Sequence, residues 1–239
     1  MCFHSMASLG DALEYPMEHD DWMKTLLIGG VLSIFAFLLI PIIVVYGYIV
    51  RVIRHSLDGD PRPPEFGDWG DLLVDGLKML VILIVYMLIP AIVAAVTVGG
   101  SVAAMATGTR SGAAAGVAGL VVGFLVSFVL ALAFGYVAVA AIVNFAREGS
   151  VGAAFDFDTL RPILFDSDYA VAWALSVAVF IAVGIVTGVL NIIPFIGAII
   201  GAFVGFYAQI VAARLWADGY GAARGYGTDD WDSAGESTV

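Results

Sequence analysis

Four long stretches without a charged residue dominate the chain: residues 25–50, 79–109, 111–146 and 169–213. A helix that crosses a membrane needs roughly 20 apolar residues, so the last stretch is long enough for two helices. Backbone polar groups in lipid must be satisfied internally, which only helices and closed barrels achieve. The apolar runs are continuous rather than alternating, and this excludes a barrel. The pattern therefore predicts an all-α, polytopic helical membrane protein.

The number of helices that cross the membrane depends on the structure of residues 22–57. If the chain turns at Pro41, these residues form a short hairpin and the protein has about six transmembrane helices, arranged as three hairpin-like repeats. If Pro41 only kinks one helix, the same residues form a single span and the protein has five. Proline disfavours helical geometry in the residue before it, here Ile40, so Pro41 is a candidate for either the turn or the kink.

A recurring helix ending favours the hairpins. Three segments begin with glycine and an aromatic residue and continue with apolar residues. Each then reaches an arginine shortly before an acidic residue that is followed by glycine. Arginine in the last turn and glycine just beyond it are common at helix C-termini, and their recurrence at matching places indicates repeated helix pairs. The segments are GYIVRVIRHSLDGD (47–60), GYVAVAAIVNFAREGS (135–150) and GFYAQIVAARLWADGY (205–220), and Ile-Pro recurs at 40–41, 89–90 and 193–194.

The basic residues predict the orientation. With three hairpins, nine of the 10 Lys and Arg residues lie on one side of the membrane and only Arg110 lies on the other. Lys and Arg are enriched in cytoplasmic loops, so we expect a cell-membrane protein with both termini in the cytoplasm. The single-span alternative gives a slightly weaker split of eight to two.

The expected organisation follows from these boundaries. Residues 1–21 form an N-terminal surface segment, 22–217 a single transmembrane domain, and 218–239 an acidic, glycine-rich tail that we expect to be disordered. Small residues spaced by four, such as Gly112/Gly116, Gly119/Gly123 and the stripe Gly197, Gly201 and Gly205, predict close helix packing. Within the domain we expect an amphipathic interfacial segment at 66–78, helices at 77–98 and 112–145, an external turn at 99–112, and a break at 191–194 between two helices in 168–217.

Composition narrows the class of partner. The chain is 61% hydrophobic with a net charge of −11, and its acidic residues all lie outside the apolar stretches. A negative protein lacks the basic surface that binds nucleic acid, so none is expected. Dense surface acid is typical of proteins that work in very high salt, although it also simply solubilises polar loops. We expect the lipid bilayer as one partner and a protein, reached through the cytoplasmic loops, as another.

One group of polar residues is the candidate site. Arg51, Arg54 and His55 share a helical face where the chain leaves the membrane, and Asp68, Trp69 and Asp75 follow across a proline-rich bend. We call these six residues the interfacial patch. Its cations can bind a lipid phosphate or pair with the aspartates, and pairing within the protein is the simpler interpretation. No catalytic motif, cofactor motif or metal-ligand cluster is present, because His4, His19 and His55 are far apart in the sequence.

The function predicted is a non-enzymatic scaffold or accessory subunit. A small transporter or channel, with its path lined by Asn144, Asn191 and Gln209, is the alternative. For buried polar residues of this kind, hydrogen bonding between helices is the more common role. Membrane-embedded lipid chemistry is a third option, which the lack of a buried acid, His or Lys disfavours.

Some of these motifs resemble a known family. The segments DDWMKTLLIGG (20–30), GYIVRVIRHSLDGD (47–60) and PEFGDWGDLLVDGLK (64–78) resemble archaeal multi-pass membrane proteins of domain of unknown function family 4013. The resemblance extends over about residues 9–220. It implies a membrane location and, together with the acidity, a salt-loving archaeal source. It implies no activity and no catalytic residues.

Overall fold

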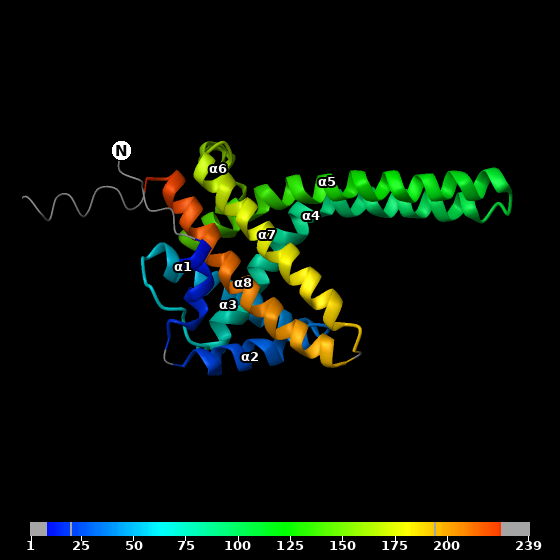
Figure 1. Ribbon diagram of the computed structural model, residues 1–239. Coiled ribbons are helices and arrows are strands. Elements are labelled where there is room, and N and C mark those ends of the chain that lie inside the picture. Colours follow the sequence, from blue (N-terminus) through cyan, green and yellow to red (C-terminus); the bar gives the residue numbers. More distant parts are fainter. Residues whose placement is uncertain (1–8, 20, 194, 226–239) are drawn as a thin grey trace, which may run out of the picture. The chain divides into compact units, whose positions relative to one another are not determined.

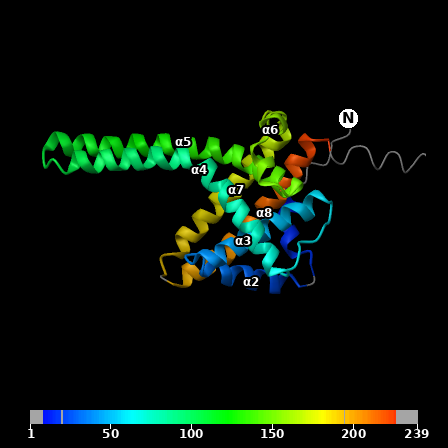
Figure 2. The same cartoon turned by 180° about the vertical axis from the view of Figure 1, so that it is seen from behind.

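The computed structural model describes residues 9–19, 21–193 and 195–225, and these residues form helices without any strand. The all-α prediction is therefore confirmed for the described part of the chain. The elements, shown in Figures 1 and 2, are α1 (Leu9–Glu14), η1 (Tyr15–Met17), α2 (Trp22–Ile34), α3 (Leu39–Leu57), α4 (Trp69–Met105), α5 (Arg110–Glu148), η2 (Val151–Phe155), α6 (Phe157–Leu164), α7 (Ser167–Leu190) and α8 (Ile196–Ala223).

Five of the described helices are long and apolar enough to cross a membrane: α3, α4, α5, α7 and α8. The helix α2 is apolar but has only 13 residues, or about 20 Å at 1.5 Å per residue, and falls short of a typical hydrocarbon core of about 30 Å. The length and composition of these helices thus support a helical membrane protein.

The break in the helix lies a few residues before Pro41, where the turn or kink was predicted. The chain leaves helical geometry at residues 35–38, and Pro41 lies in the first turn of α3. A proline is tolerated there because the first backbone N–H groups of a helix have no partner within the helix. Residues 22–57 are therefore two helices, and the single helix kinked at Pro41 is wrong.

The helix α4 is longer than predicted at both ends. The expected interfacial segment at 66–78 and the helix at 77–98 are parts of one 37-residue helix that contains Pro90. The external turn expected at 99–112 shrinks to residues 106–109, because Gly99 and Gly100 stay helical. Glycine costs a helix about 1 kcal/mol relative to alanine, whereas an unpaired backbone group in lipid costs several kcal/mol, so the helix continues.

The chain divides into two compact units, which we describe separately. The hairpin unit is Val81–Ala138, and the core unit comprises the described residues up to Leu80 and from Val139 onward. In the hairpin unit, the small residues of α5 lie directly on α4: Gly116 faces Ser101 and Met105, and Gly123 faces Thr97. Close helix packing at these predicted positions is confirmed.

The core unit is built around the three segments with the recurring ending. Most residues of α3 from Val44 to Ile53, of α5 from Val139 to Ala146 and of α8 from Phe206 to Tyr220 are buried. The short helix α1 covers part of this core, where Ala12 packs with Val211 and Leu215 of α8. That the three segments belong to three repeated hairpins stays a prediction.

Glycines in the core unit mark where helices touch. The ring of Phe206 on α8 lies where a Cβ of Gly29 on α2 would be, and the ring of Phe203 does the same at Gly30. In the predicted stripe on α8, Gly197 lies against the backbone of Leu190, whereas Gly205 has open space around it. Gly201 faces Thr187 of α7, where a Cβ would lie 3.3 Å from its Cγ2, so the stripe contributes to the α7–α8 contact at Gly197 and Gly201 but not at Gly205.

The closest approach is the crossing of α3 and α4, which involves a glycine on each helix. A Cβ at Gly47 would overlap the carbonyl oxygen of Leu72, and a Cβ at Gly76 would overlap the carbonyl oxygen of Ile43. Both obstacles are backbone atoms, which cannot rotate aside like the end of a side chain. Only glycine at both positions allows this backbone-to-backbone contact.

The crossing predicts a large effect of one methyl group. Gly47→Ala should lower the free energy of unfolding by at least the 1–3 kcal/mol that is typical of overpacking, because the two helices must move apart. The midpoint of thermal unfolding in detergent measures this loss. Gly205→Ala is the matched control, since nothing lies within 4 Å of the added group and alanine favours helix. Equal midpoints for the two variants would contradict the crossing.

Candidate functional site

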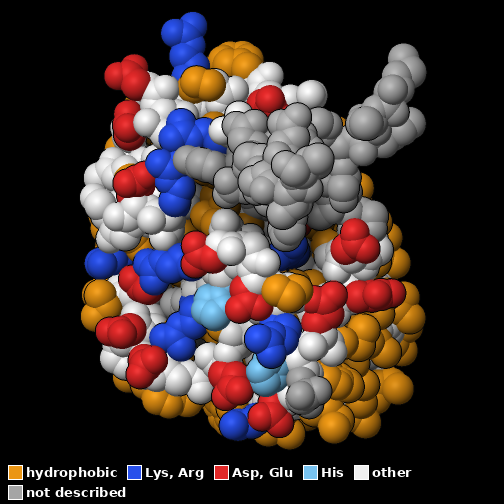
Figure 3. Space-filling model, turned by 90° about the vertical axis from the view of Figure 1, so that its left-hand side faces the viewer, with side chains coloured by type: hydrophobic (Ala, Val, Ile, Leu, Met, Phe, Trp, Pro, Cys, Tyr) orange, Lys and Arg blue, Asp and Glu red, His pale blue; other side chains and the backbone are white. Residues whose placement is uncertain are grey.

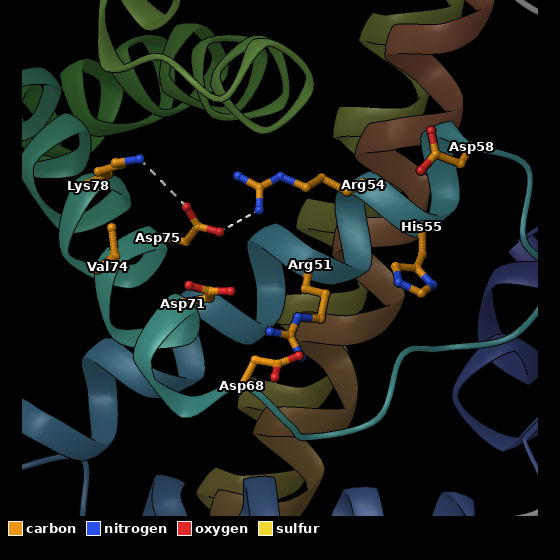
Figure 4. Close-up of a pocket in the computed structure, with 9 residues that line it drawn as sticks. All are labelled: Arg51, Arg54, His55, Asp58, Asp68, Asp71, Val74, Asp75 and Lys78. Carbon is orange, nitrogen blue, oxygen red and sulfur yellow. Dashed lines mark hydrogen bonds and ion pairs between the residues drawn. The ribbon is translucent and has the colours of Figure 1, made fainter.

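An open cleft of about 620 Å³ lies in the core unit, between the C-terminal half of α3 and the beginning of α4 (Figure 4). It is lined almost entirely by charged side chains of both signs. Its residues are Arg51, Arg54, His55, Asp58, Asp68, Asp71, Val74, Asp75 and Lys78.

Helical spacing explains why these residues face one another. Arg51, Arg54 and His55 follow Gly47 on α3 by one to two turns, and Asp68, Asp71, Asp75 and Lys78 are three or four residues apart around the start of α4. Residues at such spacings lie on the same side of a helix. The glycine crossing then brings the cationic side of α3 opposite the acidic side of α4.

The centre of the cleft is the ion pair between Arg54 and Asp75. Arg54 Nε also donates a hydrogen bond to the carbonyl oxygen of Ala146 at 2.9 Å, so one side chain joins α3, α4 and α5. Lys78 Nζ lies 3.9 Å from the other carboxylate oxygen of Asp75. Figure 4 shows the Asp75 carboxylate between these two cations. Pairing of the patch within the protein, the simpler interpretation of the sequence, therefore occurs at this point.

Arg51 binds the backbone of the proline-rich loop and not a carboxylate. Its Nη1 donates to the carbonyl oxygen of Gly67 at 2.9 Å and to that of Glu65 at 3.4 Å. One turn earlier, the hydroxyl of Tyr48 donates to the carbonyl oxygen of Pro64 at 3.0 Å, and its ring stacks on Phe66 with centroids 4.1 Å apart. The proline-rich loop is thus fixed against α3 and forms one wall of the cleft.

Three aspartates of the cleft, Asp58, Asp68 and Asp71, have no charged partner among the described residues. Within the described part of the chain, the carboxylates of these three residues take part in no ion pair, and Asp68 and Asp71 lie together at the start of α4. Asp68 has a φ of 46°, which aspartate tolerates better than most residues, and its carbonyl oxygen accepts hydrogen bonds from the first backbone N–H groups of α4. The start of α4 therefore offers two neighbouring carboxylates to a ligand in the cleft.

His55 belongs to a different side of the cleft. Its Nδ1 lies 3.8 Å from Oδ2 of Asp60, and in Figure 4 its ring points away from the Arg54–Asp75 pair. Figure 3 looks onto a face of the molecule on which basic, acidic and histidine side chains alternate, with apolar side chains along the lower right edge.

Five of the six residues of the interfacial patch line the cleft, namely Arg51, Arg54, His55, Asp68 and Asp75. Trp69 does not, since its half-exposed ring stacks on Phe66 with centroids 6.0 Å apart. The patch omitted Asp71 and Lys78, although their spacing of three and four residues from Asp68, Asp75 and each other was visible in the sequence. That the patch has a binding role stays a prediction.

The sequence did not indicate a second cluster of polar side chains, because Glu65 is far along the chain from His19 and Asp21. The ligand atoms of His19, Asp21 and Glu65 lie within 4.8 Å of one another. However, Nδ1 of His19 accepts a hydrogen bond from the backbone N–H of Asp21 at 2.9 Å, which places the ring proton on Nε2, 3.4 Å from Glu65 Oε1. Neither ring nitrogen then has a free lone pair, and the arrangement fits a histidine–carboxylate pair better than a metal site.

The polar residues of the predicted transport path lie at different levels of the core unit. Asn144 is buried and links elements: its amide donates to the carbonyl oxygen of Ala153 at 2.8 Å and accepts from the hydroxyl of Tyr220 at 2.7 Å. Asn191 and Gln209 instead donate to carbonyl oxygens of their own helices. Gln209 and Tyr220 are 11 residues apart, or about 16 Å along α8. The described residues therefore do not bring the three amides together.

The fold and the cleft define a helical membrane protein with a charged site near the ends of its apolar helices. A family model described as "Protein of unknown function (DUF4013)" matches residues 31–192, and the chain belongs to this family. The matched region is shorter than the expected 9–220 and includes every residue of the cleft. No curated protein and no solved structure matches the chain.

The cleft predicts unequal effects of two neighbouring aspartates. Asp75→Asn should lower the free energy of unfolding by about 1–3 kcal/mol, because it leaves Arg54 without its carboxylate partner. Asp71→Asn, one turn away and exposed, should change it by less than about 0.5 kcal/mol. Thermal unfolding of both variants in detergent measures the difference, and a larger loss for Asp71→Asn would contradict the assigned roles.

Proposed function

We propose that the protein is a non-enzymatic membrane scaffold or accessory subunit, and that a protein partner binds in the α3–α4 cleft. The observation that carries the proposal is the pair of neighbouring carboxylates at the start of α4, Asp68 and Asp71, which have no partner among the described residues, whereas the cations of the cleft are paired or bonded to backbone. A Lys or Arg side chain of a partner fits these acids, because binding surfaces place positive groups opposite negative ones.

The shape of the site also suits a protein segment. The cleft is open and of the size that admits a few side chains. One wall is the loop fixed by Arg51 and Tyr48, so the site is formed before the partner arrives. A preformed site loses little conformational entropy on binding.

The orientation belongs to the same proposal. Nine of the ten Lys and Arg residues lie in segments predicted to be on the same side of the membrane as the cleft. Since Lys and Arg are enriched on the cytoplasmic side, we place the cleft and both termini in the cytoplasm of a cell-membrane protein. The net charge of −11 further suggests a cell with high internal salt, as in salt-loving archaea. Salt at that concentration screens repulsion among the acids.

Partner binding should depend on the two free acids. The double variant Asp68→Asn/Asp71→Asn should lose a partner that co-purifies with the unaltered protein in high salt, while its unfolding midpoint stays unchanged. Asp158→Asn, an exposed acid on α6 away from the cleft, is the control and should retain the partner. Retention by the double variant, or equal loss by the control, would sink the proposal.

Stability should rise with salt. Between about 0.1 M and 1 M KCl the Debye length falls from about 10 Å to about 3 Å, which weakens repulsion among the excess acids. The midpoint of thermal unfolding should therefore increase over this range. Replacing the exposed Asp58, Asp71 and Asp158 by Asn should reduce the slope. A midpoint that falls with added KCl would argue against adaptation to high salt.

A further inference from the structure

The turns that end the three long hairpins differ in polarity. The α4–α5 turn contains Thr107 and Thr109, whose hydroxyls are 3.0 Å apart, and Arg110 begins the next helix. The α2–α3 turn at residues 35–38 has the sequence FAFL, and residues 191–195 between α7 and α8 read NIIPF. Neither of these two turns contains a charged residue.

Both apolar turns are exposed to the surroundings of the protein. The exposed fractions are 78% for Phe37, 79% for Ile192 and 84% for Phe195. Phe195 also has a φ of 66°, a strained conformation for a bulky residue. Water is an unfavourable surrounding for a group of large apolar side chains of this size, so these tips point to an apolar medium.

The two apolar tips lie at the same end of the core unit. The helix α2 runs antiparallel to α8, since Gly29 contacts Phe206 and Gly30 contacts Phe203. Both views of the fold accordingly show the α2–α3 and α7–α8 turns near each other (Figures 1 and 2). Arg51 and Arg214, in contrast, lie toward the other ends of α3 and α8 and contact the 58–68 loop there.

Although α3 has 19 residues, its last seven include Arg51, Arg54 and His55, so the uncharged part of the α2–α3 hairpin is too short to reach across a bilayer. From Leu39 to Val50, the apolar part of α3 has 12 residues, or about 18 Å. Arg51 cannot be drawn deeper, because it is bonded to the backbone of the loop at Glu65 and Gly67. With a hydrocarbon core of about 30 Å, the tip ends inside the lipid.

The depth of the α7–α8 tip follows from its place beside the α2–α3 tip, because α2 packs along α8 at Gly29 and Gly30. The exposed large apolar side chains of α7 lie mainly between Phe180 and Val189, and those of α8 lie between Ile196 and Ile200. The ten residues of α7 from 180 to 189 span about 15 Å. Beyond these segments, most of α8 from Phe206 to Tyr220 is buried in the protein core.

We propose that α2–α3 and α7–α8 are re-entrant hairpins: they enter the bilayer together from the charged face and end within the hydrocarbon. Their tips, around Phe37 and Phe195, contact lipid acyl chains, whereas the helices of the α4–α5 hairpin, with 37 and 39 residues and a polar turn between them, are long enough to reach the opposite face. The proposal rests on helix length, exposure and charge, and does not depend on what the cleft binds.

Cysteine labelling tests which turns reach water. Cys2 is the only cysteine in the chain, so Cys2→Ser gives a background for single cysteines. A membrane-impermeant maleimide is added to sealed vesicles of both orientations. We expect Asp158→Cys to react from one face and Thr109→Cys from the other. Phe37→Cys and Phe195→Cys should react from neither face and should react fully after denaturation in SDS.

Two outcomes of the labelling overturn the proposal. Reaction of Phe37→Cys or Phe195→Cys from the Thr109 face means that the hairpin crosses the membrane. Reaction from the Asp158 face means that the tip lies on the surface. Gel filtration of each variant before reconstitution confirms that the protein is folded.

A depth profile distinguishes a buried tip from one that is merely hidden by protein. Nitroxide labels at the exposed positions Ile181, Ile185, Val189 and Ile192 report depth through the ratio of collisions with oxygen and with a water-soluble nickel chelate. A re-entrant α7–α8 hairpin gives a depth that increases steadily to the tip. A crossing hairpin gives the greatest depth in the middle of α7 and a shallower tip, and this result would refute the proposal.

Discussion

The contact between the backbones of α3 and α4 is the constraint on which the site depends. Gly47 and Gly76 let the two helices touch without side chains between them. As a result, Arg54, two turns after Gly47, pairs with Asp75, the residue before Gly76, and the proline-rich loop lies against Arg51 and Tyr48. With larger residues at the crossing the helices would be separated by the width of a side chain, and the cleft would lose both its ion pair and its preformed wall.

Burial separates each helix of the core unit into two parts with different surroundings. In α8, residues 206–220 are mostly enclosed by protein, whereas the side chains of Ile196, Ile199 and Ile200 are exposed. The same change occurs along α3, whose buried part begins at Val44. One continuous apolar stretch can therefore face the protein core along part of its length and lipid along the rest. The length of such a stretch does not by itself show how far a helix extends across the membrane.

The sequence predicted the helices and most of their order, because charged residues interrupt the apolar stretches at the loops. It also predicted five of the cleft residues, since charges three and four apart on adjoining helices are visible in the sequence. It misplaced the break at residues 35–38 because FAFL differs little in polarity from its neighbours. It ended α4 too early, because Gly99 and Gly100 break helices in water but not where backbone groups lack other partners. The His19–Glu65 contact depends on tertiary structure alone.

The geometry of Arg54 limits how a ligand can use the cleft. Arg54 bonds Asp75 of α4 and the carbonyl oxygen of Ala146 of α5, so it connects the beginning of one long helix with the end of the other. A ligand cation that took Asp75 from Arg54 would leave a partly buried guanidinium without its carboxylate, which is costly. Asp68 and Asp71 are free of such a role, and a ligand cation bound there adds an ion pair without breaking one. The acids that stabilise the fold and the acids available for binding are thus separate residues of the same helix face.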